Sequence, residues 1–124
     1  MSSNPNAADP LQVVCLCADW CNNCRAYQPL FESLQSQFNG AVRFAWIDIE
    51  DESEVLGEVD VENFPTLLVL RAQHPLFLGP VTPQLGVLVQ LVQTALDGRM
   101  QALTGSTECA LAVRVHHHLS QLQA

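Results

Sequence analysis

Apolar residues recur along the chain with two different spacings, one typical of strands and one typical of helices. Residues 11–17 are almost continuously apolar, which indicates a central strand buried on both faces. Residues 42–48 and 66–71 predict two further strands. Residues 76–78 predict a fourth, paired antiparallel with the third across a turn at Gln73-His74-Pro75.

Between these strands the apolar positions take on helical spacing. Residues 22–37 predict a helix, and Pro29 inside it is expected to bend the helix because proline removes one intrahelical hydrogen bond. Residues 52–57 predict a short helix or turn, and residues 82–97 predict an amphipathic helix. The order of these elements predicts an α/β fold with a central mixed sheet, in which a parallel pair is joined to an antiparallel hairpin and helices flank both.

The chain divides into three segments of different character. Residues 1–10 are polar and predict a flexible leader, and residues 11–98 form the expected α/β domain. Residues 99–124 predict a helical extension from Thr104 onward, although residues 110–115 also suit a strand. We expect this extension to pack on the domain or to make a homodimer contact.

Composition and charge exclude several classes of function. The net charge is −8 and the chain has no lysine, so no basic patch is available for nucleic acid or anionic lipid. No apolar run approaches the roughly 18 residues of a membrane-spanning helix, and no signal peptide is visible, so the predicted location is cytoplasmic. The carboxylates that crowd between Asp48 and Glu62 form either a solvated face or a docking surface for a basic partner.

The candidate chemistry lies in Cys21-Asn22-Asn23-Cys24, between the first strand and the first helix. Free backbone N–H groups and the helix dipole favour negative charge at a helix N-terminus, and this setting lowers a cysteine pKa. Cys21, as the leading residue, is expected to attack a substrate disulfide. Cys24, one turn further in, then resolves the mixed disulfide. This redox-active disulfide needs no dissociable cofactor, but it needs an unidentified reductase or oxidant to recycle it.

Three segments, in the same order, resemble the thioredoxin family. The active-site stretch of the family resembles Ala18-Asp19-Trp20-Cys21-Asn22-Asn23-Cys24-Arg25, and the proline of its active-site helix matches Pro29. Its cis-proline segment matches Phe64-Pro65-Thr66. The resemblance implies a thioredoxin-like fold and a protein disulfide substrate. It also implies that Trp20 forms a wall of the active site, and that the backbone of Phe64, beside a cis Pro65, pairs with an extended substrate.

The sequence departs from the family pattern in several places. Few residues precede Cys21, which leaves no room for the family's full leading strand and helix, and the C-terminal extension is longer than usual. The Asn22-Asn23 dipeptide replaces glycine-proline, which leaves the direction of electron flow open. Cys15 takes the place of a buried acid, and Trp46 takes the place of its paired lysine. The usual internal base for Cys24 is therefore missing, and slower turnover is expected.

Cys15 and Cys17 share one face of the predicted strand and have three interpretations. They are core thiols, or auxiliary thiols that trap Cys24 in another disulfide, or ligands of a zinc or iron–sulfur site with the motif cysteines. The His116-His117-His118 run, with Cys109, suggests a metal site less strongly, because consecutive helix residues diverge in direction. No metal site is therefore predicted.

The sequence thus predicts a small thioredoxin-like protein-disulfide oxidoreductase that acts in cell redox homeostasis. The alternative is a thioredoxin-fold interaction module, a chaperone or assembly factor, in which redox chemistry is secondary.

Overall fold

The computed structural model describes residues 11–18, 22–38, 42–57, 66–81 and 84–123. Its elements, in chain order, are β1 (Leu11–Cys17), α2 (Asn22–Gln37), β2 (Val42–Asp48), α3 (Ser53–Leu56), β3 (Thr66–Arg71), β4 (His74–Pro80), α4 (Leu85–Leu96) and α5 (Ser106–Gln123). The predicted leader, residues 1–10, lies outside the described residues. None of the helices in the described ranges is long and apolar enough to cross a membrane.

The four strands form one mixed sheet in the order β2-β1-β3-β4. β1 pairs in parallel with β2 and antiparallel with β3, and β3 pairs antiparallel with β4. This arrangement confirms the predicted α/β fold, with a parallel pair and an antiparallel hairpin. Because β1 has a neighbour on each side and helices on each face, its seven residues are all buried, as their continuous apolar character predicted.

The hairpin between β3 and β4 is tighter than the sequence suggested. We predicted a turn at Gln73-His74-Pro75, but His74 pairs with Arg71, and Pro75 is already part of β4. Ala72 makes the tight turn possible by adopting a positive φ of 54°. Pro75 is tolerated because β4 is an edge strand, where a missing backbone N–H leaves no ladder bond unmade.

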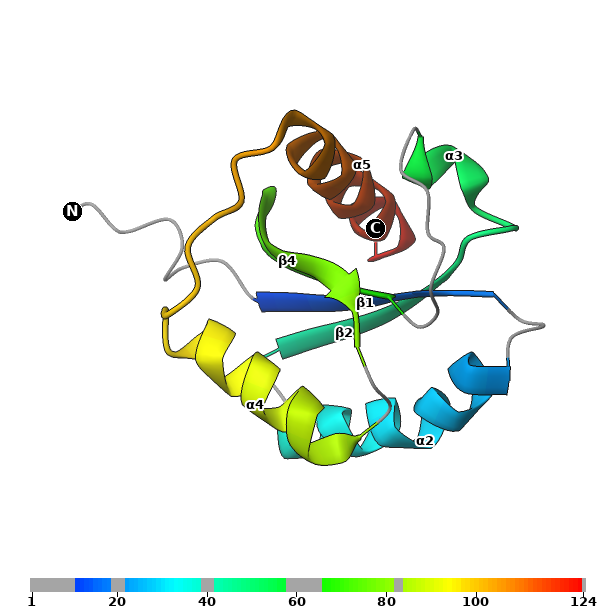
Figure 1. Ribbon diagram of the computed structural model, residues 1–124. Coiled ribbons are helices and arrows are strands. Elements are labelled where there is room, and N and C mark those ends of the chain that lie inside the picture. The colour runs from blue at the N-terminus through cyan, green and yellow to red at the C-terminus, as the bar shows by residue number, and fades with distance from the viewer. Residues whose placement is uncertain (1–10, 19–21, 39–41, 58–65, 82–83, 124) are drawn as a thin grey trace.

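Helices cover both faces of the sheet (Figure 1). α2 and α4 pack on one face, where the odd-numbered residues of β1, Leu11 to Cys17, enter a buried cluster with Tyr27 and Phe31. α3 and α5 pack on the other face, where Val14 and Leu16 of β1 enter a second cluster. Alternation along the strand therefore decides which β1 side chains reach which face.

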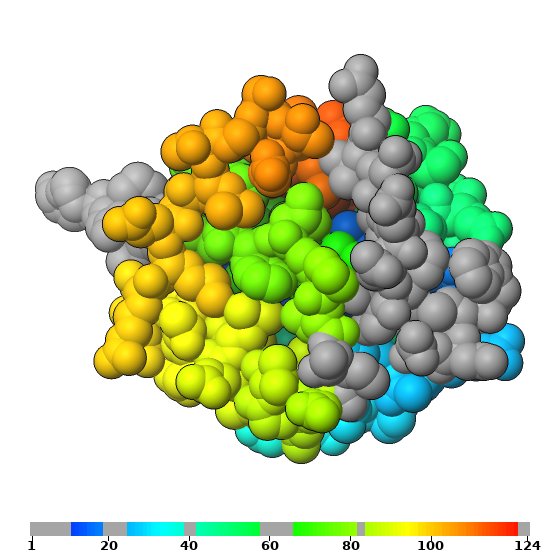
Figure 2. All heavy atoms as spheres, in the orientation of Figure 1, coloured from blue at the N-terminus to red at the C-terminus, as the bar shows by residue number. Residues whose placement is uncertain are grey.

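The C-terminal segment forms the long helix α5, so the alternative of a strand over residues 110–115 is wrong. Leu111, Ala112, Val115 and Leu119 recur at helical spacing and are buried against the sheet. The segment between α4 and α5 passes beside β4 on the surface (Figure 2), and Leu103 N–H donates a 2.8 Å hydrogen bond to Pro75 C=O. That bond gives the edge strand a partner it would otherwise lack.

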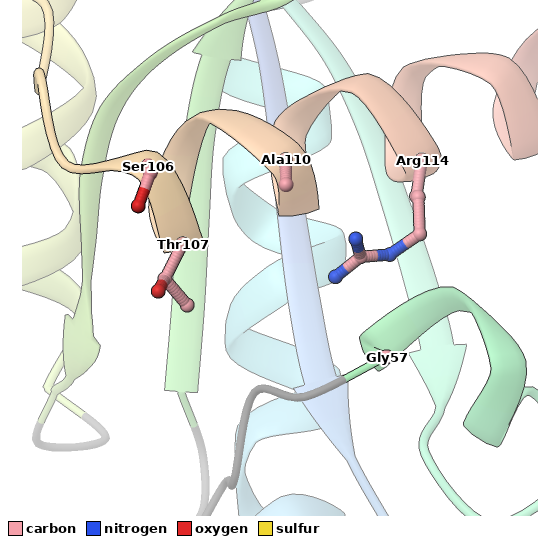
Figure 3. A pocket seen from close by; sticks show the side chains of 5 residues that line it. All are labelled: Gly57, Ser106, Thr107, Ala110 and Arg114. Atoms are coloured by element: carbon pink, nitrogen blue, oxygen red, sulfur yellow. The ribbon is translucent and has the colours of Figure 1, made fainter.

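Arg114 joins α5 to the end of α3. Its Nε donates to Val55 C=O at 2.8 Å, and its Nη2 donates to Leu56 C=O at 2.7 Å. These two bonds satisfy carbonyl groups that a short helix leaves without partners. The guanidinium reaches them past Gly57, across a small surface pocket (Figure 3). Gly57 is required there twice over, because its φ is 58° and an added Cβ would lie 2.7 Å from Arg114 Cζ.

Candidate active site

In the sequence, the Cys21-Asn22-Asn23-Cys24 motif follows β1 and overlaps the start of α2. β1 ends at Cys17, and α2 begins at Asn22, so the backbone of Cys24 is in the first turn of the helix. Backbone N–H groups in a first turn have no intrahelical acceptor, which favours a thiolate there. Trp20 and Cys21 lie outside the described residues, and so do the side chains of Asn22, Asn23 and Cys24.

The predicted substrate-binding segment enters the described structure at the same end of the sheet. Phe64 and Pro65 lie outside the described residues, whereas Thr66 is buried and is the first residue of β3. Thr66 pairs with Leu16, the last but one residue of β1. The strand that follows Pro65 therefore starts beside the strand that leads into the motif.

Cys15 and Cys17 lie together beneath this end of the sheet. Both are fully buried on the face that α2 and α4 cover, and their Sγ atoms are 3.4 Å apart. Cys15 carries a free thiol, whereas Cys17 is disulfide-bonded. The backbone at Cys17 is bonded to the residue after β2, since Cys17 C=O accepts a 2.9 Å hydrogen bond from Ile49 N–H.

The Cys15 thiol does not serve as a base at neutral pH, because it stays protonated there. Burial raises the pKa of the Cys15 thiol to about 12. Its neighbour across the parallel ladder is Trp46, whose ring packs edge-on against Phe31 at a centroid distance of 6.1 Å. Cys15 and Trp46, the two residues predicted to replace a buried acid and its lysine, are thus a protonated thiol and an indole.

Tyr27 is a buried polar residue that sequence reasoning missed. Burial, and then the charge of Cys15, raise the pKa of its phenol. Its hydroxyl is buried and has no hydrogen-bond partner among the described residues. Tyr27 precedes the buried Phe31 by four residues, a helical spacing that was the available signal for its burial.

Three of the candidate metal ligands, Cys109, His116 and His117, contact separate protein groups. His116 Nδ1 lies 3.4 Å from Gln12 Oε1, and His117 Nε2 lies 3.1 Å from the Gln121 side-chain amide. Cys109 is half-buried, with its Sγ 3.5 Å from Leu103 C=O. Within the described ranges, no three His, Cys, Asp or Glu side chains gather in a way that would hold a metal ion.

Comparison with known proteins places this geometry in a family. The family model for thioredoxin matches residues 4–79. Thioredoxin of Oryctolagus cuniculus is 36% identical over 61 residues, which are 49% of this chain and 57% of that protein. Thioredoxin H2-2 of Oryza sativa is 38% identical over 69 residues, which are 56% of this chain and 48% of that protein. The chain thus spans about half the length of the curated relatives it matches.

The fold has solved counterparts as well. The germline-specific thioredoxin Deadhead of Drosophila melanogaster superposes with a TM-score of 0.63 at 23% identity, covering 71% of this chain and 83% of that one. A malarial protein superposes with a TM-score of 0.62 at 17% identity, covering 69% of this chain and 97% of that one. These structures show the same fold, and the family match over residues 4–79 shows that the chain belongs to the thioredoxin family.

Proposed function

We propose that this protein is a thiol–disulfide oxidoreductase that acts on protein disulfides through Cys21 and Cys24. The Cys21 thiolate attacks a substrate disulfide, which forms a mixed disulfide and releases one substrate thiolate. Cys24 then attacks the Cys21 sulfur, which releases the second substrate thiolate and leaves a Cys21–Cys24 disulfide. Two electrons pass from the dithiol to the substrate, and a reductase must return them before the next cycle.

The observation that carries this proposal is the start of α2 at Asn22, immediately after Cys21. It gives the motif the helix N-terminus that activates a thiol. Membership of the thioredoxin family supports the same chemistry. Trp20, Asn22 and Asn23 are proposed to shape the surface around Cys21.

Substrate binding is proposed to use the segment that leads into β3. Phe64 and a cis Pro65 present backbone groups to an extended peptide, and the buried Thr66 anchors the segment to the sheet. A net charge of −8 disfavours nucleic acid and anionic membranes as partners. The proposed setting is the cytoplasm, where reduced thiols are maintained.

Reduction of insulin disulfides tests the proposal. The wild-type protein is expected to reduce insulin with dithiothreitol as the electron source, and Cys21→Ser is expected to lose this activity entirely. Cys109→Ser is the matched control, because Cys109 lies on α5, across the sheet from α2. Wild-type activity in the Cys21→Ser variant would refute the proposed reaction.

The direction of electron flow needs a second measurement. Equilibration of the motif against glutathione gives its reduction potential. A value of about −270 mV makes the protein a reductant, and one of about −120 mV makes it an oxidant.

A second candidate, a binding module with secondary redox chemistry, rests on the acidic turn after β2. Asp48 Oδ1 accepts hydrogen bonds from the backbone N–H groups of Glu50 and Asp51, at 2.8 and 3.3 Å, which leaves exposed carboxylates on a fixed turn. Equal function of the wild type and of Cys21→Ser in cells would favour this candidate.

A further inference from the structure

The outer side of α4 carries no charge. The twelve residues Leu85–Leu96 include no Asp, Glu, Lys or Arg. Leu88, Val92 and Ala95 are buried in the cluster with β1, which leaves the opposite side of the helix to solvent. A surface helix usually places charged residues on its solvent side. An uncharged outer side is therefore unusual on a chain with a net charge of −8.

A shallow groove lies on this uncharged side. Val87, Gln90, Leu91, Thr94 and Met100 line it. The first four recur at spacings of three and four residues, so they form one stripe along the helix, and Met100 extends the stripe past the helix end. Val87 is 42% exposed, and within the described ranges only Val113 is a comparably exposed large apolar residue. The groove thus offers apolar surface to a partner.

The polar groups around the stripe are largely satisfied within the helix. Thr94 Oγ1 donates a 2.7 Å hydrogen bond to Gln90 C=O, and Gln93 Nε2 donates a 3.1 Å hydrogen bond to Asp97 Oδ1. Within the described residues, the side-chain amide of Gln90 makes no hydrogen bond. The midpoint of the stripe therefore has an amide that can bond to a partner.

We propose that α4 packs against α4 of a second copy of this chain, as an antiparallel pair about a two-fold axis at Gln90. This pairing brings the two Gln90 amides together, and each amide can donate one hydrogen bond and accept one. Gly86 of one copy then faces Thr94 of the other, because these residues lie four positions on either side of Gln90. An added Cβ at Gly86 meets nothing within 4 Å in this chain, so the helix backbone is open to close approach there.

The distribution of charge favours a second copy as the partner. Five carboxylates lie in residues 48–54, at the end of β2 and in α3. α3 and α4 lie on opposite faces of the sheet (Figure 1), so a pair of α4 helices keeps these carboxylates apart. A basic partner would instead be attracted to the acidic turn. Two copies of an acidic chain meet with least repulsion at an uncharged side.

The C-terminal extension, where the sequence suggested a homodimer contact, has less apolar surface to offer. The stripe of α5, formed by Leu111, Ala112, Val115 and Leu119, is buried against its own sheet. Val113 remains on the outer side of α5 and is 44% exposed. Val87 and Val113 are thus the same residue type on two helices with nearly equal exposure, which makes Val113 the matched control.

Sedimentation equilibrium of the full chain under reducing conditions tests the proposal. The reductant removes any intermolecular disulfide between the five cysteines of each copy. Because one helix pair buries less than the roughly 1,200 Å² of a standard interface, the dimer is expected to form in the micromolar to millimolar range. Raising the salt concentration should increase the dimer fraction, since salt screens the repulsion between two acidic copies.

Two charge substitutions locate the contact. Val87→Glu should raise the dimer dissociation constant by about tenfold or more, because it places a charge in the apolar groove of each copy. Val113→Glu should change the constant by no more than about twofold. The two variants have the same net charge, so a general electrostatic effect would appear in both.

Mixing two variants identifies the partner as a second copy. Gln90→Glu and Gln90→Lys should each dimerise more weakly than the wild type, because like charges meet at the two-fold axis. An equimolar mixture of the two should associate more strongly than either variant alone, because opposite charges then meet there.

A wild type that stays monomeric throughout this concentration range would overturn the inference. So would a dimer that persists unchanged in Val87→Glu, a dimer that Val113→Glu dissociates equally, or a Gln90 mixture that associates no better than its components. None of these readouts uses insulin reduction, so the outcome is independent of the proposed function.

Discussion

The buried clusters on the two faces of the sheet differ in composition. On the α2 and α4 face, the buried cluster contains the sulfurs of Cys15 and Cys17 and the Tyr27 hydroxyl among its apolar side chains. On the α3 and α5 face, the described cluster is wholly aliphatic: Val14, Leu16, Ile47, Val55, Leu56, Leu68, Leu70, Leu111, Ala112, Val115 and Leu119. The same seven-residue strand supplies both, because its side chains alternate.

This difference separates reactivity from stability within one small domain. The sulfurs of Cys15 and Cys17 and the phenol of Tyr27 lie buried under the helix that carries the motif. The opposite face is covered by the C-terminal helix, and its buried cluster is aliphatic, with the Gln12–His116 contact as a polar contact beside it. Substitutions on the two faces should therefore change different measured properties.

The largest effect is expected from the α5 face. Leu111→Ala should lower the free energy of unfolding by about 2–5 kcal/mol, because a fully buried leucine leaves a cavity. Urea denaturation measures this loss. Insulin reduction per folded molecule should stay at the wild-type level.

Val113→Ala is the matched control, since Val113 lies on the same helix and is 44% exposed. Its change should stay within about 0.5 kcal/mol. Equal losses from the two substitutions would contradict the assignment of α5 as a packed layer.

Burial of Cys15 on the α2 face should make the protein less stable in alkaline solution. The folded-state pKa of Cys15 is raised from 9.0 to about 12, so this thiol stays protonated in the fold while it ionises in the unfolded chain. The stability that the protonated Cys15 gives the folded protein is therefore complete below pH 9. As the pH rises towards 12, the free energy of unfolding falls by about 1.4 kcal/mol per pH unit. The pKa of Tyr27 is raised too, and its phenol acts in the same direction at higher pH.

Urea midpoints measured across this range test the expectation, with Cys15→Ala as the comparison. The chain has no lysine and only one tyrosine, so the other groups that titrate in this range are mainly the remaining cysteines, which the Cys15→Ala comparison keeps unchanged. Tyrosinate absorbance should appear only as the protein unfolds. An identical pH dependence in Cys15→Ala would rule out burial of Cys15 as the cause.

A smaller effect is expected where α5 meets α3. Gly57→Ala should lower stability by about 1–2 kcal/mol, because alanine disfavours the left-handed conformation and its Cβ displaces Arg114. Thermal unfolding measures the change.

Gly86→Ala is the control, since Gly86 lies in α4 and an added Cβ meets nothing within 4 Å. It should leave stability unchanged or raise it by up to about 1 kcal/mol. A neutral Gly57→Ala would show that the Arg114 contact does not depend on this glycine.

The smallest effect concerns the missing internal base. Cys15→Asp should speed insulin reduction several-fold at neutral pH, equivalent to about 1 kcal/mol in the barrier, because a carboxylate accepts the proton of Cys24. Cys15→Ser, which supplies no acid, should leave the rate at the wild-type level. No change in the aspartate variant would mean that Cys15 does not occupy the place of the family's acid.

Local sequence pattern determined most of the elements of this protein. Continuous apolar residues identified β1, and three-to-four spacing identified α2 with its bounds, because both signals arise within a single segment. The motif and the proline segment were likewise visible as short stretches. The geometry of the β3–β4 hairpin could not be predicted from the local sequence, because the turn at Ala72 depends on a positive φ that alanine rarely adopts.

Only the tertiary structure decided which groups meet across the sequence. The reach of Arg114 to Val55 and Leu56 joins segments nearly sixty residues apart, and no local periodicity encodes it. The burial of Tyr27 beside Cys15, and the side of the sheet that α5 covers, depend in the same way on how the layers stack. Periodicity specifies the direction of a side chain from its own backbone, whereas its neighbours depend on the packing of the whole chain.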